Sequence, residues 1–368
     1  MLQPHPSSLH IEENVMLAPL TTIGLGGPAR FFVTAGNRET VEQALSWART
    51  NTLPLFVLGG GSNLVISDRG FDGLVVHLRL RGVDLVDADG AVLVRAAAGE
   101  PWDPLVARCV KLDLAGIECL SGIPGYVGAT PIQNVGAYGQ EVSETIVEVE
   151  ALDRVTGELC RFSNEECGFA YRSSRFKKGD QGRYLVVSVA FRLLRGGAPA
   201  MRYPELVKEL GGEKTPSLSR IRELVIAVRR RKGMVIDPSD PDTRSDGSFF
   251  MNPIIDEAEV EGFLDRVRKG GGLREGELPP MYPVSEGIKL SAAWLIERAG
   301  FSRGYGEGRV GLSTRHTLAI VNRGGATSSE LLMLVRRIRQ RVHEQLGIVL
   351  PPEPVFVGFT GEELAGVV

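Results

Sequence analysis

The sequence predicts an α+β fold of two or three domains, on three observations. The chain has 368 residues, and a single hydrophobic core rarely grows beyond roughly 250–300 residues. Segments with strand-like and helix-like apolar spacing are mixed along the chain, which argues against one doubly wound parallel sheet. A Gly-Gly-Ala-Pro sequence at 196–199 interrupts the pattern between the two halves.

The first half is predicted to consist of short strands with two helices among them. Residues 31–33 form a strand, and Thr40 caps a helix in which Val41, Ala44 and Leu45 recur at helical spacing. The other predicted elements of this half are a helix over 103–112 and strands over 55–58, 74–78, 92–97, 146–152, 159–162 and 184–194.

The second half is predicted to be richer in helix. Thr327 and Glu330 have the spacing of a capping box, and the residues after them place apolar side chains on one face of a long helix. The other predicted elements of this half are helices over 219–232, 260–268 and 291–299, and strands over 248–251, 317–321 and 355–357.

Composition and charge exclude several classes of protein. Hydrophobic residues make up 43% of the chain, charged residues 24%, and the formal net charge is -3. These values are typical of a globular protein without attraction to nucleic acid or anionic membranes. No stretch approaches the ~20 apolar residues of a membrane helix, and residues 1–20 lack a signal-peptide pattern. We therefore expect no membrane and no nucleic-acid partner. We also expect the protein to be cytoplasmic and a monomer.

Cysteines, histidines and basic runs predict neither a metal site nor a nucleic-acid site. The five histidines are scattered, so no metal is expected. The basic runs 229–232 and 336–341 lack interleaved aromatic residues and are interpreted as solvated helix faces, with Lys232 alone kept as a candidate phosphate ligand. Four cysteines without CxxC spacing are expected to be reduced thiols: Cys109, Cys119, Cys160 and Cys167.

A run of three glycines follows the predicted buried strand at 55–58. Gly59, Gly60 and Gly61 allow backbone amides to approach an anion closely, and Ser62 and Asn63 add side-chain donors. By itself the motif also fits a flexible turn. It is not a Walker loop, because no Gly-Lys-Ser/Thr follows.

Two further glycine-rich segments differ in what they predict. Residues 24–29 match the GxGxxA dinucleotide pattern, but they lead into a strand rather than a helix, so we reject that interpretation. Residues 121–139 contain five glycines and no helical or strand period. A loop this long is usually functional or disordered, and its apolar residues argue against disorder. Its backbone amides are candidates for binding another part of a pyrophosphate-bearing cofactor.

Three side chains stand out as candidates for chemistry. Arg172 lies in a Tyr-Arg-Ser-Ser-Arg-Phe run, and a guanidinium fork suits a carboxylate or a phosphate. Ser248 follows Gly247 without a GxSxG pattern or an evident histidine partner, which argues against an acyl-transfer serine. Glu353 lies among prolines just before a predicted strand. Taken singly, these also fit a basic surface turn, a strand-start serine and a loop carboxylate.

In their order, these segments resemble the UDP-N-acetylenolpyruvoylglucosamine reductase family. The resemblance extends from Thr21 to Phe356, and Tyr126 and Pro354 depart from it, where the family usually has a small residue and valine. The matching segments are 21–29, 60–63, 123–139, Tyr171-Arg172, 247–253, 294–297 and Glu353.

The resemblance implies an FAD-binding domain of the vanillyl-alcohol-oxidase type, a smaller α+β substrate-binding domain, NADPH as reductant and a role in peptidoglycan precursor synthesis. It implies a lead-in at 1–24, the FAD domain at 25–197, a lid and connecting helix at 198–232, and the substrate domain at 233–360. The implied cofactor contacts are Gly59, Gly60, Gly61, Ser62, Asn63, Gly122, Ile123, Pro124, Gly125, Val127, Gly128, Ala129, Gln133, Asn134, Gly136, Ala137 and Tyr138. The implied substrate contacts are Tyr171, Tyr203, Lys232, Asn252 and Lys289.

The implied catalytic residues suit the chemistry of an enol ether conjugated to a carboxylate. Hydride addition at the terminal carbon pushes charge onto the carboxylate, and Arg172 binds that charge. A protonated Glu353 shares this task, and Ser248 protonates the inner carbon. One alternative is a sugar or lactone oxidase on the same flavin fold, which has no obvious use for these three residues. The other is a non-catalytic nucleotide-binding or nucleic-acid-binding protein, which flavin absorbance of the purified chain would exclude.

Overall fold

The computed structural model describes residues 3–270 and 278–368. These residues form two compact units, each made of several stretches of the chain. Unit 1 contains the residues up to Val15, Ala29–Gly61 and Asp72–Val235. Unit 2 contains Met16–Pro28, Ser62–Phe71 and Ile236–Val368.

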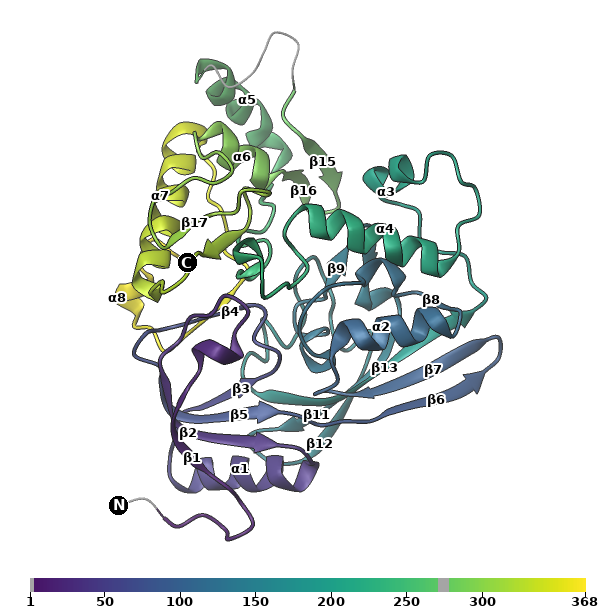
Figure 1. Cartoon of the computed structure of the whole chain (residues 1–368), viewed down its shortest axis with the longest axis vertical. Helices are drawn as coiled ribbons and strands as arrows, with labels where there is room; N and C mark the ends of the chain where they lie inside the picture. Colours follow the sequence, from purple (N-terminus) through teal and green to yellow (C-terminus); the bar gives the residue numbers. More distant parts are fainter. Residues whose placement is uncertain (1–2, 271–277) are drawn as a thin grey trace. The chain divides into compact units, whose positions relative to one another are not determined.

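The first sheet of unit 1 has four strands, and helix α1 covers it (Figure 1). Apolar residues of α1 such as Val41 and Leu45 pack with Phe31 of the sheet in one core. The helix begins with Asn37 as its cap, whose side chain accepts from the Thr40 amide, so the predicted Thr40 cap is wrong by three residues. The elements are β1 (Glu12–Met16), β2 (Pro28–Ala35), β5 (Phe71–Leu78), β3 (Leu55–Leu58), in sheet order, and α1 (Arg38–Thr50).

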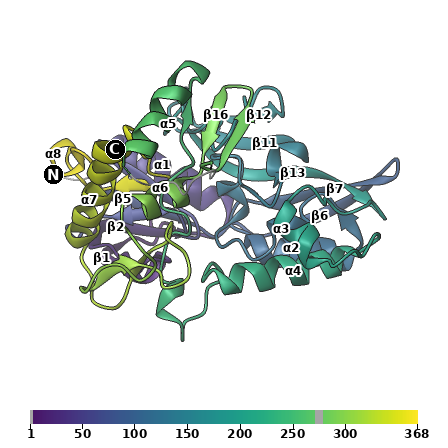
Figure 2. The same cartoon turned by 90° about the horizontal axis from the view of Figure 1, so that it is seen from above.

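The second sheet of unit 1 is antiparallel, and three helices lie together beside it (Figure 2). Trp102 at the start of α2 contacts Phe191 of the central strand β13, with ring centroids 5.7 Å apart. The strands are β12 (Leu159–Ser163), β11 (Ile146–Asp153), β13 (Tyr184–Arg195), β7 (Ala91–Ala97) and β6 (Val83–Ala88), with β8 (Leu114–Ala115) also paired to β13. The helices are α2 (Trp102–Lys111), α3 (Pro204–Glu209) and α4 (Leu218–Arg231), and β9 (Gly136–Ala137) pairs with β10 (Gln140–Glu141).

Unit 2 combines small sheets with helices around its own core. The capping box of Thr327 and Glu330 is present, and Leu331, Val335 and Ile338 of the helix that follows are buried. The strands are β14 (Ile254–Ile255), β16 (Gly287–Leu290) and β15 (Met281–Val284), β17 (Val310–Leu312) with β18 (Ile320–Asn322), and β4 (Leu64–Ile66) with β19 (Val355–Val357). The helices are α5 (Val260–Lys269), α6 (Ala292–Arg298), α7 (Ser328–Leu346) and α8 (Gly361–Leu364). Short 3-10 turns lie in unit 2 at Ala18–Leu20, Pro241–Thr243 and Glu257–Glu259, and in unit 1 at Glu118–Leu120, Val127–Ala129 and Val142–Glu144.

The predicted strand at 248–251 is wrong. Only Phe250 forms a bridge, to Pro352, while the Phe249 amide donates to the Leu318 carbonyl at 2.8 Å. Three of the four residues at 351–354 are prolines, which have no amide hydrogen, so a strand ladder cannot continue there. The predicted strand at 317–321 is shifted and shortened to β18. Strand β6 and helix α3 are not among the predicted elements.

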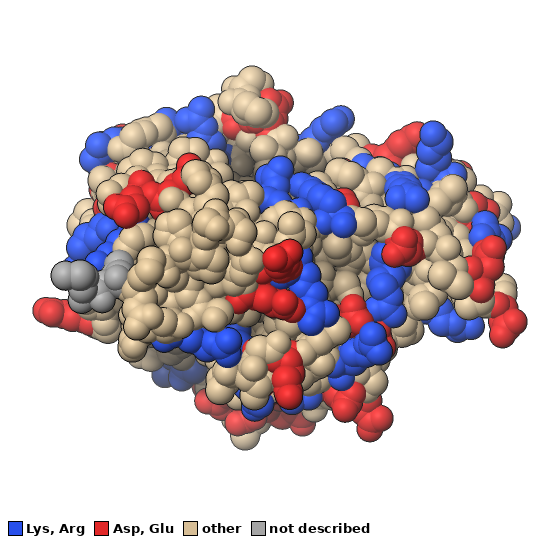
Figure 3. All heavy atoms as spheres, turned by 90° about the horizontal axis from the view of Figure 1, so that it is seen from below, with Lys and Arg blue, Asp and Glu red and all other residues tan. Residues whose placement is uncertain are grey.

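The distribution of charged side chains on the surface and the state of the cysteines are consistent with the composition of the chain. On the face shown in Figure 3, basic and acidic side chains are interspersed. In the described residues no helix is long and apolar enough to cross a membrane, and no group of three or more His, Cys, Asp and Glu is arranged to hold a metal ion. All four cysteines are free thiols, as predicted.

Candidate active site

The glycine run after β3 packs closely against the second glycine-rich segment of unit 1. A Cβ atom on Gly60 would lie 2.7 Å from the Cα atom of Gly125, so a larger residue would collide with backbone. Gly61 follows in the left-handed conformation, with φ +62°. The Gly125 carbonyl accepts from the Trp102 amide at 3.0 Å, which holds this contact against the start of α2. The two segments therefore form one cradle of closely spaced backbone.

Tyr126, where the reductase motif usually has a small residue, occupies a place built by three neighbours. The His77 ring stacks on it with centroids 6.3 Å apart, and Arg79 donates to its hydroxyl at 3.1 Å. The Arg81 guanidinium lies 5.6 Å from the ring centroid. Burial, together with the two arginines, lowers the pKa of His77 to about 4. The imidazole is therefore neutral at physiological pH and tolerates both cations.

The beginning of the second glycine segment is anchored through a carboxylate. Asp103 accepts from the Gly122 amide at 2.6 Å and from both terminal nitrogens of Arg222, at 2.6 and 2.9 Å. Asp103 belongs to α2 and Arg222 to α4, so two helices hold this end of the loop. This bidentate pairing is the strong form of an ion pair.

Arg229 of α4 lies buried beneath the same loop, so its assignment to a solvated face is wrong. It is 9% exposed, and its Nη2 donates to the Met234 carbonyl at 2.8 Å. A Cβ atom on Gly122 would lie 3.4 Å from its Nε. Among the described residues, that buried Nε atom has no hydrogen-bond partner. An unused buried donor beside a glycine loop fits a ligand that presents an acceptor atom there. The signal in the sequence was its position four residues after the apolar Val225, on the inward face of the helix.

Arg172 is tied to the far end of the glycine-rich segment. Its Nη2 donates to the Gly136 carbonyl at 2.6 Å, and a Cβ atom on Gly136 would lie 3.2 Å from its Nη1. Asn134, 1% exposed, donates to the Ala170 carbonyl at 3.1 Å. The predicted catalytic arginine and the predicted cofactor loop are therefore neighbours in unit 1.

The turn that carries Arg172 is strained. Ala170 and Ser173 exchange two backbone hydrogen bonds of 3.0 Å, which places Tyr171 and Arg172 at the tip. Arg172 has φ +50°, a conformation that costs a non-glycine residue about 1 kcal/mol or more. Such strain persists where surrounding contacts enforce it, and it is common at functional sites.

Two predicted substrate residues, Tyr203 and Lys232, meet the loop residue Tyr138. The rings of Tyr138 and Tyr203 pack edge to face, 5.3 Å apart. Lys232 Nζ lies 5.9 Å from the Tyr138 ring centroid and forms an ion pair of 2.6 Å with Glu205 of α3. Burial, above all, raises the pKa of Tyr138 to about 12. The cluster therefore joins a neutral phenol, a cation and the first turn of α3.

Three of the predicted residues of unit 2 lie near the beginning of β4. The Glu353 amide donates to the Phe249 carbonyl at 2.9 Å, so Glu353 lies on the segment next to Ser248. Asn63 donates from its side chain to the Glu353 carbonyl at 3.3 Å. Within unit 2, no described residue forms a hydrogen bond with the Ser248 hydroxyl. Unit 2 thus brings Ser248, Glu353 and Asn63 together, whereas Arg172 belongs to unit 1.

Other predicted residues have structural tasks. Asn252 accepts from the Ala292 amide at 2.9 Å and holds the first turn of α6. Lys289 is a residue of β16, paired with Ile254 and Tyr282. The amides of Val127 and Gly128 donate to the carbonyls of Glu100 and Ala98, each at 2.9 Å. Those two amides are therefore occupied. Ile123, Pro124, Ala129 and Gln133 lie along the same loop of unit 1, and Ala137 lies in β9.

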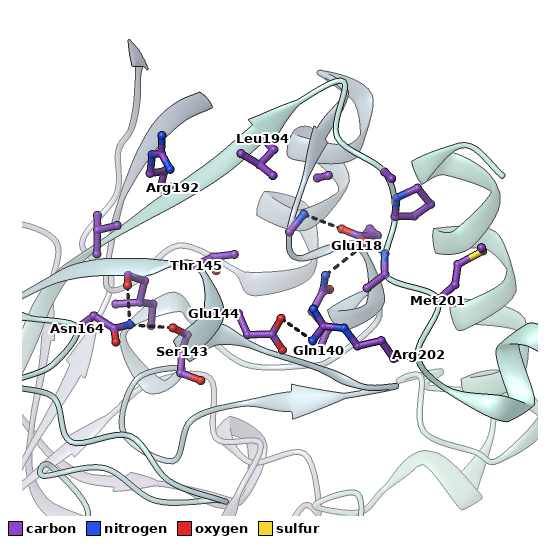
Figure 4. Close-up of a pocket in the computed structure, with 17 residues that line it drawn as sticks. Glu118, Gln140, Ser143, Glu144, Thr145, Asn164, Arg192, Leu194, Met201 and Arg202 are labelled. Atoms are coloured by element: carbon purple, nitrogen blue, oxygen red, sulfur yellow. Dashed lines mark hydrogen bonds and ion pairs between the residues drawn. The ribbon is translucent and has the colours of Figure 1, made fainter. Parts of the chain in front are cut away.

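Unit 1 also contains a cavity of about 630 Å³ lined by none of the predicted residues. Glu118, which is fully buried, lies in its wall and accepts from the Ala200 amide at 2.8 Å and from Gln140 at 3.2 Å (Figure 4). Arg202 and Glu144, which also line it, form an ion pair of 2.9 Å. These contacts fix the chain just before α3.

Comparisons with known proteins fit this geometry. Residues 29–163 match the model of an FAD binding domain, and residues 238–357 match that of the UDP-N-acetylenolpyruvoylglucosamine reductase C-terminal domain. A UDP-N-acetylenolpyruvoylglucosamine reductase of Thermobifida fusca (strain YX) is 51% identical, over 94% of this chain and 98% of its own. The chain belongs to the UDP-N-acetylenolpyruvoylglucosamine reductase family. The reductase of Streptomyces coelicolor is also 51% identical, over 93% of this chain and 89% of its own.

The fold of the chain is similar to that of a solved reductase of this family. The reductase of Thermus caldophilus has a TM-score of 0.64 and 27% identity, over 95% of this chain and 99% of its own. The predicted fold class, an α+β protein with an FAD-binding domain followed by a reductase C-terminal domain, is confirmed.

Proposed function

We propose that this chain is an FAD-dependent UDP-N-acetylenolpyruvoylglucosamine reductase. It uses NADPH to convert the enolpyruvyl ether of UDP-N-acetylglucosamine into UDP-N-acetylmuramate, a precursor of peptidoglycan. The observation that carries the proposal is the 51% identity to a reductase across nearly the whole of both chains. Cell-wall synthesis then links the protein to cell shape and division, and we place it in the cytoplasm as a monomer.

The residues of unit 1 fit a flavin dinucleotide. The Gly60–Gly125 contact supports a pyrophosphate cradle, and the unused Nε of Arg229 supports an acceptor atom nearby. In the proposal, the predicted loop residues hold FAD, except that Val127 and Gly128 act through shape because their amides are occupied. Bound there, FAD would supply hydride chemistry, with NADPH as the reductant.

The side chains supply binding, charge and a proton. Arg172, held at the tip of its strained turn, binds the carboxylate of the enolpyruvyl group and the charge that develops there. Glu353 in its protonated form donates a hydrogen bond to the same carboxylate, and Ser248 protonates the inner carbon. Tyr171, Tyr203, Lys232, Asn252 and Lys289 are the proposed contacts to the rest of the sugar nucleotide.

The proposal also assigns a role to each segment of the chain. Residues 1–24 lead in, residues 25–197 hold the flavin, and residues 233–360 bind substrate. Residues 198–232 form a lid and connecting helix. The edge-to-face contact of Tyr203 with Tyr138 and the anchoring of the preceding segment by Glu118 support a lid that pivots at this point.

An absorbance experiment tests the function. The purified chain should show a flavin spectrum, lose it anaerobically on adding NADPH, and regain it on adding the enolpyruvyl substrate. Acid precipitation should release the flavin, because no covalent link is proposed. Rapid reoxidation by oxygen, with no response to the enolpyruvyl substrate, would favour a sugar or lactone oxidase instead.

A further inference from the structure

The segment that carries Ser248 is attached on several sides within unit 2. The Ser245 carbonyl accepts from the Thr22 hydroxyl at 2.8 Å. The Gly247 amide donates to the Ser245 hydroxyl at 3.3 Å. Beyond Ser248, the Phe249 carbonyl accepts from the Glu353 amide at 2.9 Å. The serine therefore lies between neighbours whose positions depend on specific polar contacts.

Asp246, two residues before the serine, is an anomaly among these contacts. Its side chain is buried, and its Oδ1 lies 3.3 Å from the Thr22 hydroxyl. The Leu64 amide also donates to it. Its Oδ2 is buried and, among the described residues, has no partner. A carboxylate with an unpartnered buried oxygen would be costly in this place.

A neutral acid explains the contacts. Burial raises the pKa of Asp246 to about 8, against the opposing hydrogen bonds from Thr22 and Leu64. A hydroxyl has one hydrogen to donate, and the shorter of the two Thr22 contacts is that to the Ser245 carbonyl. The protonated acid can then donate to the Thr22 oxygen, so that Asp246, Thr22 and Ser245 form one chain of hydrogen bonds.

We propose that Asp246 is a positioning residue for Ser248, joining the segment that carries the serine to the Thr22 hydroxyl and the Leu64 amide. Leu64 directly follows Asn63, whose side chain binds the Glu353 carbonyl. The same carboxyl group thereby links the serine to the part of unit 2 that holds Glu353. The inference rests on the proposed role of Ser248 as proton donor.

No cation on the two segments that touch Asp246 can neutralise its carboxylate when it ionises. The two segments that touch it, 21–25 and β4, contain no titratable side chain, and its own segment contributes Asp242 and Arg244. Only burial, Thr22 and Leu64 shift its pKa. Above pH about 8 an unpaired charge would form there, and the segment must move toward water or lose its contacts. We therefore expect the proton transfer by Ser248 to fail in alkaline solution.

Stopped-flow measurement of the two half-reactions from pH 6 to 9.5 tests the inference on the FAD-loaded protein. In the wild type, the reaction of the reduced protein with the enolpyruvyl substrate should fall about tenfold per pH unit above pH about 8. In Asp246→Asn, which is neutral at every pH, it should stay within roughly threefold of the wild type at pH 7 and lose this alkaline decline. Reduction by NADPH should be unchanged in both. An Asp246→Asn protein with the wild-type alkaline decline overturns the inference.

Three further variants make the outcome unambiguous. Thr22→Val keeps the shape but removes the hydroxyl, and it should slow the substrate half-reaction alone; unchanged kinetics would contradict the inference even if Asp246→Asn fails to fold. Asp242→Asn is the matched control, because the Asp242 carboxylate accepts from the Thr314 amide at 3.1 and 3.2 Å. This variant should keep the alkaline decline.

Ser248→Ala separates the failure of the proposed function of Ser248 from the failure of the positioning role of Asp246. If Ser248→Ala leaves the substrate half-reaction intact, the proposed role of Ser248 fails. If Ser248→Ala slows that half-reaction but Asp246→Asn keeps the wild-type alkaline decline, only the positioning role of Asp246 fails.

Discussion

Arg172 combines backbone strain with charge in a single residue. Its left-handed φ of +50° puts it at the tip of a two-residue turn, and its guanidinium donates to the Gly136 carbonyl at 2.6 Å. The strain is held by contacts to the loop that we assign to the flavin. A point charge on a flexible stem does not reproduce this fork.

Both Arg172→Lys and Arg172→Ala should slow the reaction with the enolpyruvyl substrate by roughly 100-fold or more, as expected for loss of one transition-state donor. Reduction by NADPH should change little, and stopped-flow traces of each half-reaction will show the difference. Arg175→Lys is the control, because Arg175 pairs with Asp180 at 2.7 Å in the same segment. Near-normal turnover by Arg172→Lys would remove the proposed role.

Ser248 is the proposed proton donor, and no described residue of unit 2 binds its hydroxyl. Ser248→Ala should leave flavin reduction by NADPH near normal and lower the substrate half-reaction by at least ~100-fold. Ser248→Cys should keep part of the activity, since a thiol also donates a proton. Equal slowing of both half-reactions in Ser248→Ala would make the serine structural.

At the scale of elements, the residues of the proposed site lie mostly on loops and short helices. The two glycine segments meet at Gly60 and Gly125. Helix α3, which precedes α4, adds Tyr203 at its cap and Glu205 in its first turn. Both features depend on close contacts between segments that lie far apart in the chain.

Gly60→Ala should lower the amount of bound FAD, because its Cβ would lie 2.7 Å from the Cα of Gly125 and push the two loops apart. Flavin absorbance per protein and the melting temperature measure the effect. Gly36→Ala is a matched control, since a Cβ there meets no atom within 4 Å. Full flavin content in Gly60→Ala would show that the cradle tolerates expansion.

Tyr203→Ala should raise the KM for the enolpyruvyl substrate several-fold without slowing reduction by NADPH, because it removes the contact with Tyr138 that supports closure of the proposed lid. Glu209→Gln is a useful control on the same helix, since Glu209 pairs with the exposed Arg231 and such pairs contribute little. An unchanged KM in Tyr203→Ala would rule out the lid.

At the scale of the whole molecule, two buried groups give opposite dependences of stability on pH. The pKa of Asp246 is raised to about 8, from about 3.9 in an unfolded chain. Its contribution to the free energy of unfolding is full below pH about 4 and is lost as the pH rises through about 8. The pKa of His77 is lowered to about 4, from about 6.5. Its contribution is present above pH about 6.5 and is lost as the pH falls through about 4.

The two slopes oppose each other between pH about 4 and 6.5, and only that of Asp246 remains between about 6.5 and 8. We expect the free energy of unfolding to fall across this upper window, by at most about 1.4 kcal/mol per pH unit. Asp246→Asn should flatten the decline, which urea unfolding at pH 6.5, 7.2 and 8 will measure. A parallel decline in wild type and variant would mean that Asp246 is ionised throughout.

The sequence by itself determined the features that depend on local pattern. Apolar periodicity and the capping box placed α7 correctly, strands such as β3 and β7 followed from apolar runs, and the ordered motifs led to the reductase family. Each of these signals is contained in a short stretch of the chain, so no knowledge of distant contacts is needed to interpret it.

The tertiary structure alone decided which polar groups are buried and what they contact. Arg229 looked like one more charge in a basic run, but the glycine loop covers it. Asp246 carried no local signal, because its neighbours Thr22 and Leu64 are far away in sequence. The strand expected at 248–251 failed for a similar reason, since its partner segment contains prolines that cannot donate. Burial and pairing are properties of segments brought together by folding, and the chemistry of this site depends on them.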